Sequence, residues 1–217
     1  YLNYVQVGSK VNYSVEVSDG NPSQYQYQWY YFESETGDKH KIDNAQSSLY
    51  QTVASEQTSK RWYICSVRNG IITYSRRMNT KLKYSIVYNA NGGIDTPKEQ
   101  VKYQGNSLTL SDTTPEKTGY NFAGWSNSST ASEVMYLPGD IYDLDGNVTL
   151  YAVWKPKEYK IYYDANGGSN APETQSKYYG KQEYISNIQP QKTGYKFLGW
   201  SVNSGAKEIT YKPGDIY

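Results

Sequence analysis

The side chains in this sequence that are best suited to catalysis are a single histidine and a single cysteine. His40 is the only imidazole and Cys65 the only thiol among 217 residues. A Ser/His/Asp or Cys/His centre needs the histidine as its base, but His40 stands in the polar stretch TGDKHKIDN, which is typical of a solvated loop. Cys65 lies in the alternating stretch WYICSV, so we expect a strand that points this side chain into the core. Neither pattern predicts a catalytic centre, and we expect no enzyme activity.

Carboxylates that could hold a metal are concentrated in the stretch DIYDLDGN, residues 140–147. Its acidic and amide side chains alternate from Asp143 onward, as in a calcium loop. An EF-hand needs glycine at the sixth place and glutamate at the twelfth, but these places hold Val148 and Trp154. A hairpin turn is the better interpretation, and one cysteine with one histidine leaves no zinc ligand set. We expect no metal and no other cofactor, although spacing alone leaves open a distant carboxylate pair for glycoside hydrolysis.

Tyrosines are the remaining candidates for ligand contacts, since the chain has 26 of them and is 16% aromatic. A flat exposed ring can stack on a sugar, so a glycan-binding surface is one interpretation. Strand alternation turns half of such side chains outward in any case, so ordinary strand surface is the favoured one. The candidate ligand-binding residues are Tyr30, Tyr31, Tyr178 and Tyr179.

The charge balance excludes several classes of partner. With 22 basic and 21 acidic residues the net charge is +1, which is not the footprint of a nucleic-acid-binding protein. The sequence has no apolar run of ~18 residues, so we expect no membrane insertion. It opens without a signal peptide, like an internal cut through a longer chain. A low cysteine content is also compatible with a surface protein of a Gram-positive bacterium.

The elements that must carry these residues form a long internal repeat. Residues 84–142 align with residues 159–217 without a gap, and 31 of the 59 aligned pairs are identical. The shared stretches include ANGG, KTGY and PGDIY. Such identity without insertions predicts one fold for both copies.

Within each copy, short strands alternate with turns. YSIVY, YKIYY and NVTLYAVW are β-branched and aromatic runs. The Asn-Gly-Gly stretches supply residues that adopt positive φ cheaply, so the predicted turn glycines are Gly92, Gly93, Gly167 and Gly168. The predicted core residues are Tyr120, Phe122, Trp125 and Trp154 in the first copy, and Tyr195, Phe197 and Trp200 in the second.

The order of these motifs resembles the internalin B repeat family, of the Listeria–Bacteroides type. The resemblance rests on Tyr-x-Ala-Asn-Gly-Gly, Pro-x-Lys-x-Gly-Tyr-x-Phe-x-Gly-Trp and Thr-Leu-Tyr-Ala-x-Trp. It covers residues 84–154, and residues 159–217 without the closing strand. It implies a β-grasp-like module and tandem arrays on secreted or wall-anchored bacterial proteins.

The first part of the chain predicts a different module. Seven or so short strands separated by turns suggest a β-sandwich. Trp29, with Tyr63 and Cys65 at the spacing of a tyrosine corner, resembles the immunoglobulin-like fold. The usual first cysteine is replaced near Val15, so we expect Trp29 to pack on Val15 and Cys65 rather than on a disulfide.

Together these patterns predict a mainly β chain with an immunoglobulin-like domain at 1–82 and β-grasp-like repeats at 83–155 and 156–217. The stretches TKLK and KPKE are expected as short linkers. We expect a monomeric, non-catalytic stalk or adhesin segment of a longer extracellular bacterial protein, with a host or matrix protein or a glycan as candidate partner. The alternative is a glycan-binding accessory module of a secreted carbohydrate-active enzyme. Because the second copy lacks the closing strand, we also expect the intact protein to continue past Tyr217 by about a dozen residues, so that its sheet edge is paired.

Overall fold

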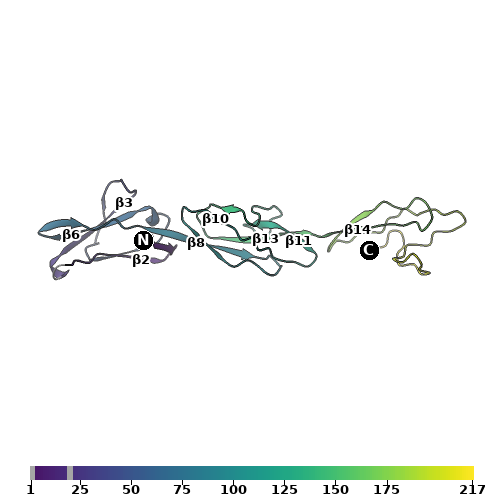
Figure 1. Cartoon of the computed structure of the whole chain (residues 1–217), viewed down its shortest axis with the longest axis horizontal. Helices are drawn as coiled ribbons and strands as arrows, with labels where there is room; N and C mark the ends of the chain where they lie inside the picture. The colour runs from purple at the N-terminus through teal and green to yellow at the C-terminus, as the bar shows by residue number, and fades with distance from the viewer. Residues whose placement is uncertain (1–2, 19–21) are drawn as a thin grey trace. The chain divides into compact units, whose positions relative to one another are not determined.

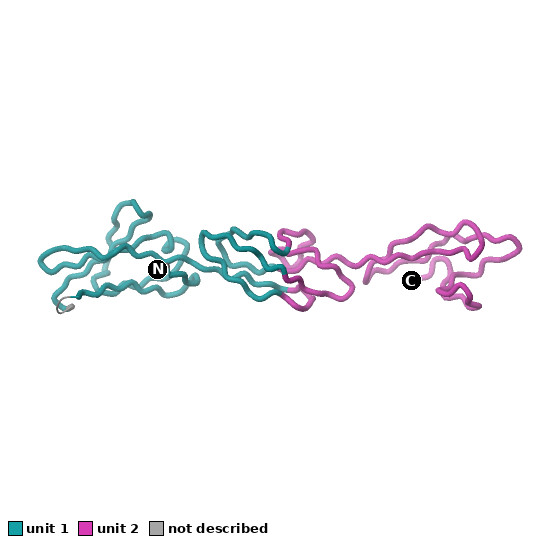
Figure 2. Tube along the Cα trace, viewed as in Figure 1, with its two compact units in different colours: residues 1–89, 97–112, 138–150 teal, residues 90–96, 113–137, 151–217 magenta. Residues whose placement is uncertain are grey.

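A computed structural model of the chain describes residues 3–18 and 22–217. The structure is mainly β, as the sequence predicts (Figure 1). The helices in the described ranges are two short 3-10 turns, η1 (Pro22–Gln24) and η2 (Thr58–Lys60). The chain divides into two compact units (Figure 2), which are described separately below. The three predicted domains and the bounds given for them stay predictions.

The first unit comprises the described residues up to 89 together with 97–112 and 138–150. Two sheets form its amino-terminal part. The smaller one pairs β2 with β5, and the larger one has the order β4-β3-β6-β7. The strands are β2 (Lys10–Ser14), β3 (Gln26–Phe32), β4 (His40–Lys41), β5 (Leu49–Val53), β6 (Trp62–Asn69) and β7 (Ile71–Tyr74).

These two sheets share one hydrophobic core. Trp29 and Cys65 are paired across β3 and β6, and both are 0% exposed. The Tyr63 ring stacks on Tyr13 of the opposite sheet, with 4.7 Å between ring centroids. The indole Nε1 of Trp29 donates a hydrogen bond of 2.8 Å to the carbonyl of Ser47, which satisfies its buried polar atom. The aromatic core replaces the missing disulfide, and the immunoglobulin-like topology stays a prediction.

The first predicted linker, TKLK, is not a linker. Thr80–Lys83 are the first residues of the ten-residue strand β8 (Thr80–Asn89). They pair in parallel with β1 (Asn3–Gln6), and Leu82 is 0% exposed. The expectation of a separate linker is therefore wrong, because pairing with a strand from the start of the chain keeps this segment extended.

The first repeat builds its sheet on β8. The five-stranded sheet has the order β1-β8-β13-β11, and β9 also pairs with β8. A second ladder joins β10 to β12. The remaining strands of this repeat are β9 (Gln100–Tyr103), β10 (Leu108–Thr109), β11 (Tyr120–Ser126), β12 (Ile141–Tyr142) and β13 (Val148–Pro156).

The second unit comprises residues 90–96, 113–137 and 151–217. In it β11 pairs with β13 from Tyr120↔Pro156 to Ser126↔Tyr151, and a bulge between Phe122 and Gly124 interrupts the ladder. The second repeat contributes β14 (Glu158–Ile161) and β15 (Gln175–Tyr178), which pair with each other. The second predicted linker, KPKE, consists of the end of β13, Lys157 and the start of β14.

The second repeat keeps the turns of the first but has fewer strands. The bridges Ser169↔Gln191 and Trp200↔Tyr211 correspond to Ile94↔Glu116 and Trp125↔Tyr136. Within residues 159–217, however, no strand corresponds to β13, and the stretch aligned with β11 is not a strand.

The predicted core of the second repeat is therefore only partly right. Tyr195 is 74% exposed, so its placement in the core is wrong. Phe197 and Trp200 are half-buried, whereas Trp125 is 0% exposed.

The Asn-Gly-Gly turns have the backbone geometry that glycine provides. Gly92 and Gly167 have φ of 86° and 80°, in the left-handed region. Gly93 is needed for space, because a Cβ there would lie 2.4 Å from the carbonyl oxygen of Glu116. At Gly168 a Cβ would lie 2.5 Å from the carbonyl oxygen of Gln191.

Candidate functional site

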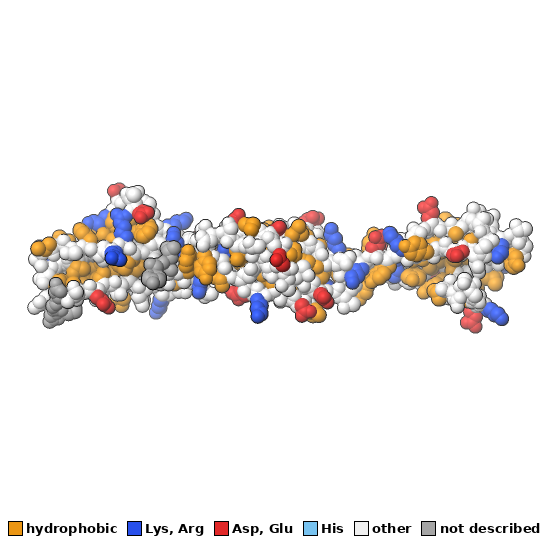
Figure 3. All heavy atoms as spheres, viewed as in Figure 1, with side chains coloured by type: hydrophobic (Ala, Val, Ile, Leu, Met, Phe, Trp, Pro, Cys, Tyr) orange, Lys and Arg blue, Asp and Glu red, His pale blue; other side chains and the backbone are white. Residues whose placement is uncertain are grey.

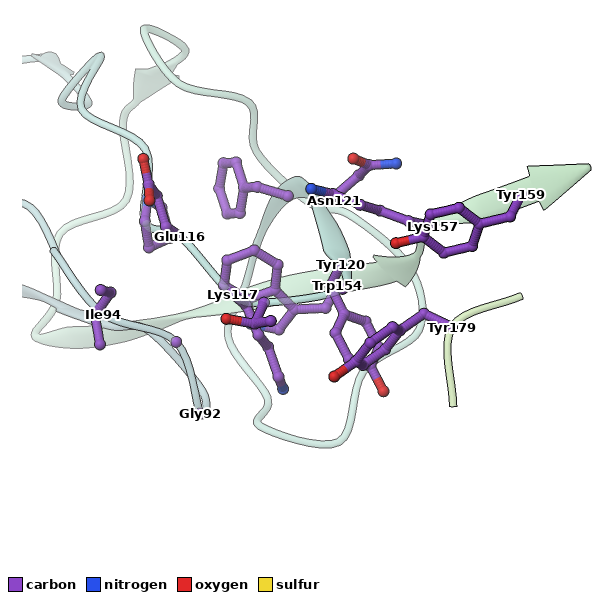
Figure 4. A pocket seen from close by; sticks show the side chains of 15 residues that line it. Gly92, Ile94, Glu116, Lys117, Tyr120, Asn121, Trp154, Lys157, Tyr159 and Tyr179 are labelled. Carbon is purple, nitrogen blue, oxygen red and sulfur yellow. The ribbon is translucent and has the colours of Figure 1, made fainter. Parts of the chain in front are cut away.

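The second unit has a groove where the second repeat follows the first (Figure 4). It has a volume of about 1050 Å³. Ile94 and Glu116 lie at one end, and Tyr159 and Tyr179 at the other. The lining residues are Gly92, Gly93, Ile94, Pro115, Glu116, Lys117, Thr118, Gly119, Tyr120, Asn121, Phe122, Trp154, Lys157, Tyr159 and Tyr179.

The wall from the first repeat is fixed by contacts to the Asn-Gly-Gly turn. Trp154 on β13 donates from Nε1 to the carbonyl of Ala90, at 2.9 Å. Lys117 donates from Nζ to the carbonyl of Asn91 at 3.2 Å, and its ammonium lies 4.9 Å from the centre of the Tyr120 ring. Trp154 and Lys117 thus hold the backbone of the Asn-Gly-Gly turn, and Lys117 also contacts the Tyr120 ring.

The groove wall that the second repeat forms packs against a glycine of the first repeat. A Cβ at Gly119 would lie only 2.2 to 2.3 Å from Cδ1, Cε1 and Cγ of Tyr179, so the face of this ring covers the glycine. The Tyr179 ring also meets the Tyr120 ring edge-on, with 5.6 Å between centroids. Two backbone hydrogen bonds also join the two repeats here. Lys157 N–H donates to Gly119 O at 2.8 Å, and Tyr179 N–H donates to Lys157 O at 2.9 Å.

The groove is lined mainly by aromatic rings and lysine side chains. Tyr159 is 48% exposed and Tyr179 is 40% exposed, so both can contact a bound molecule. Glu116 is the only carboxylate among the lining residues. Catalysis by a carboxylate pair would require a second acid here.

The other tyrosines that the sequence puts forward as ligand contacts are not gathered into this groove. Lys39 lies over the Tyr30 ring, with Nζ 4.6 Å from its centroid. Tyr31 stacks on His40 at 5.0 Å between centroids, and the Arg61 guanidinium lies 4.0 Å from the Tyr31 centroid. These rings have protein partners of their own, and of the four candidates only Tyr179 lines the groove.

The two side chains best suited to catalysis lie in different environments, because Cys65 is fully buried and His40 is exposed. Burial raises the pKa of the Cys65 thiol to about 11, so it is protonated and inert at neutral pH. His40 is exposed, as predicted, but it lies in the short strand β4 rather than in a loop.

Asp145 forms a structural ion pair with Lys102 that the sequence patterns above do not predict. Lys102 is 1% exposed, and its Nζ lies 2.5 Å from the Asp145 carboxylate, which also accepts from the Gly105 amide at 3.2 Å. The sequence feature that could have indicated this buried lysine is its occurrence at the same aligned position in both copies, as Lys102 and Lys177. Across residues 3–18 and 22–217 no group of three or more His, Cys, Asp or Glu side chains comes together as a metal site.

On the face drawn in Figure 3, acidic and basic side chains are scattered among polar and hydrophobic ones. Neither of the described helices has the length and hydropathy needed to cross a bilayer.

The chain is similar to several bacterial proteins over part of its length. A candidate membrane protein of Evansella cellulosilytica is 28% identical over 138 residues, which is 62% of this chain and 20% of that protein. A candidate Gly-rich membrane protein of the same species is 31% identical over 54% of this chain and 13% of its own length. Internalin H of Listeria monocytogenes serovar 1/2a is 30% identical over 52% of this chain and 20% of its own length. The chain therefore spans at most 20% of each of these relatives.

A family model accounts for both copies of the repeat. The Listeria-Bacteroides repeat domain matches residues 84–153 and again residues 159–216. The more specific name, internalin B repeat, stays a resemblance. With these two matches covering more than half of its length, the chain belongs to the Listeria-Bacteroides repeat family.

Proposed function

We propose that this chain is a non-catalytic stalk segment of a bacterial surface or secreted repeat protein, in which folded modules are joined without slack. The observation that carries the proposal is that both junctions consist of hydrogen-bonded backbone and interlocked side chains. A flexible linker would allow each module to reorient, whereas a paired strand resists it.

The first junction, inside the first unit, has contacts on several levels. β8 runs from the amino-terminal module into the first repeat, and β1 pairs with its first half. The Tyr84 hydroxyl donates to the Glu56 carboxylate at 2.7 Å, and Gln104 Nε2 donates to Ser59 Oγ at 3.0 Å. These side-chain bonds are partly buried, which favours a junction that does not open freely.

The second junction, inside the second unit, uses the Lys157 backbone as a bridge. Its amide donates to Gly119 of the first repeat, and its carbonyl accepts from Tyr179 of the second. The ring of Tyr179 closes over the same glycine. The relatives support a surface or secreted location: one is named as an internalin and two as candidate membrane proteins.

Removing the bridging amide tests this role of the second junction. We expect Lys157→Pro to weaken it by about 0.5–1.5 kcal/mol, because proline cannot donate to Gly119 O. In ¹⁵N relaxation, β14 and β15 should then reorient faster than β11 and β13. Lys157→Ala is the matched control, since it removes the side chain and keeps the amide. Unchanged relaxation in the proline variant would contradict a junction held by this bond.

A glycan-binding accessory module is the second candidate function, and the exposed tyrosines of the groove favour it. Tyr159 and Tyr179 present partly exposed rings beside Lys157. Rings arranged in this way can stack on a sugar and leave the lysine to contact its hydroxyl groups.

Affinity electrophoresis separates the two functions. For a stalk we expect no retardation in gels that contain mucin, starch, mannan or soluble cellulose. Retardation that disappears in Tyr159→Ala and persists in Tyr30→Ala would place a glycan in the groove and favour the second candidate. Tyr159 is the better probe than Tyr179, because Tyr179 also seats the junction.

A further inference from the structure

One position of the repeat contacts the preceding module in both copies. Gln104 and Tyr179 are aligned residues, each directly before the glycine of the same turn, Gly105 or Gly180. Both make the same backbone bond: Gln104 N–H donates to Leu82 O, and Tyr179 N–H donates to Lys157 O, each at 2.9 Å. The fold thus presents this side chain to whatever module comes before the repeat.

The chemistry at this position differs with the preceding module. Gln104 follows the amino-terminal module and uses its amide twice: Oε1 accepts from Leu82 N–H, and Nε2 donates to the buried hydroxyl of Ser59. Tyr179 follows a repeat and covers Gly119 with its ring. An amide thus meets a hydroxyl at one junction, and an aromatic face meets a bare glycine at the other.

Tyr179 covers a turn of the first repeat, residues 117–120, which we call its corner, and the second repeat has the same corner at residues 192–195. The stretch KTGY occurs at residues 117–120 and again at residues 192–195. Lys192 donates to the carbonyl of Asn166 at 2.9 Å and lies 5.1 Å from the Tyr195 ring centroid, as Lys117 does toward Asn91 and Tyr120.

The two corners differ in what covers them. Gly119 and Gly194 have nearly equal φ, 78° and 79°. Gly119 is buried under Tyr179, whereas a Cβ at Gly194 would have no atom within 4 Å, and Tyr195 is 74% exposed. The second corner is formed and accessible.

We propose that the corner Gly194–Tyr195 is a docking surface for a further repeat of this same family, one with an aromatic residue at the position of Tyr179. We infer this binding partner from the first corner, where the same four residue types pack against the Tyr179 ring of the following repeat. A repeat with glutamine at this position is built for a hydroxyl and leaves the corner uncovered. The residue before the turn glycine therefore specifies which kind of module precedes a repeat. The inference rests on the proposed function, because only closely joined modules need such pairing.

The test uses the whole chain and an extended chain in which residues 143–217 are repeated after Tyr217. The readout is the proton chemical shift of the glycine Hα atoms, which an aromatic face moves upfield. In the unextended chain we expect an upfield-shifted Gly119 Hα and an ordinary Gly194 Hα. In the extended chain we expect Gly194 Hα to move upfield as well.

Variants of the appended tyrosine that corresponds to Tyr179 make the result specific. Its change to alanine or glutamine should return Gly194 Hα to its ordinary shift, and its change to phenylalanine should keep the upfield shift. An ordinary Gly194 shift in the extended chain, with Gly119 still shifted, would overturn the inference alone. Loss of the Gly119 shift in the unextended chain would count against the rigid junction and so against the proposed function.

Discussion

Replacing Trp29 by alanine is expected to unfold the amino-terminal module. The indole projects from β3 of the larger sheet, is 0% exposed and packs near the smaller sheet, with the Tyr13 and Tyr50 centroids 6.5 and 5.9 Å away. Truncating a buried tryptophan costs about 3–5 kcal/mol, and here the Nε1 bond to Ser47 is lost as well. That is a large fraction of a small module's stability of ~5–15 kcal/mol. Loss of the β3 and β6 amide signals in urea titrations followed by NMR checks this.

Cys65→Ala is the matched control for Trp29→Ala. The thiol is equally buried and sits directly opposite Trp29 in the β3–β6 ladder, but it is small and free of any disulfide. We expect its urea midpoint to fall far less. Equal and small effects for both changes would contradict a core built around the tryptophan.

A second large effect on stability is expected from a tryptophan substitution in the first repeat, and a smaller one from the aligned substitution in the second. Trp125→Ala should destabilise the first repeat by about 3–5 kcal/mol, because Trp125, which pairs with Ala152 in the β11–β13 ladder, is 0% exposed. Its aligned partner Trp200 is half-buried, and no strand corresponding to β13 lies beside it in the described structure. We expect Trp200→Ala to cost about half as much or less, in proportion to the smaller buried area.

The two tryptophan variants share their sequence surroundings, so the comparison isolates the closing strand. Urea unfolding of each repeat can be followed through its own amide signals in one sample. Adding residues 143–154 after Tyr217 should then raise the cost of Trp200→Ala toward that of Trp125→Ala. If the two changes were equally costly without the addition, β13 would not be what buries the indole.

Features set by short-range chemistry could be predicted from the sequence. Asn91 and Gly92 reverse the chain because they enter positive φ, and their counterparts Asn166 and Gly167 repeat this. The strand alternation around Trp29 and Cys65 likewise predicts that both point inward. The mainly β class follows from the same periodicity.

Features set by distant partners could not be predicted. TKLK has the composition of a linker, but its residues pair with β1 from the start of the chain, and Lys83 also pairs with Tyr103 of β9. Lys102 is buried because Asp145, 43 residues away, neutralises it. The groove draws on both repeats, so no single stretch of sequence reveals it.

Amide hydrogen exchange at the junctions tests most directly whether the modules are joined without slack. The amides of Leu82 and Gln104 at the first junction, and of Lys157 and Tyr179 at the second, each donate a hydrogen bond of 2.8 to 3.0 Å. If the account is right, these four amides exchange as slowly as the amides of the paired strands on either side, since they open only when a module unfolds. Exchange at the rate of exposed loop residues, with the strands still protected, would show that the junctions open on their own and would contradict the stalk.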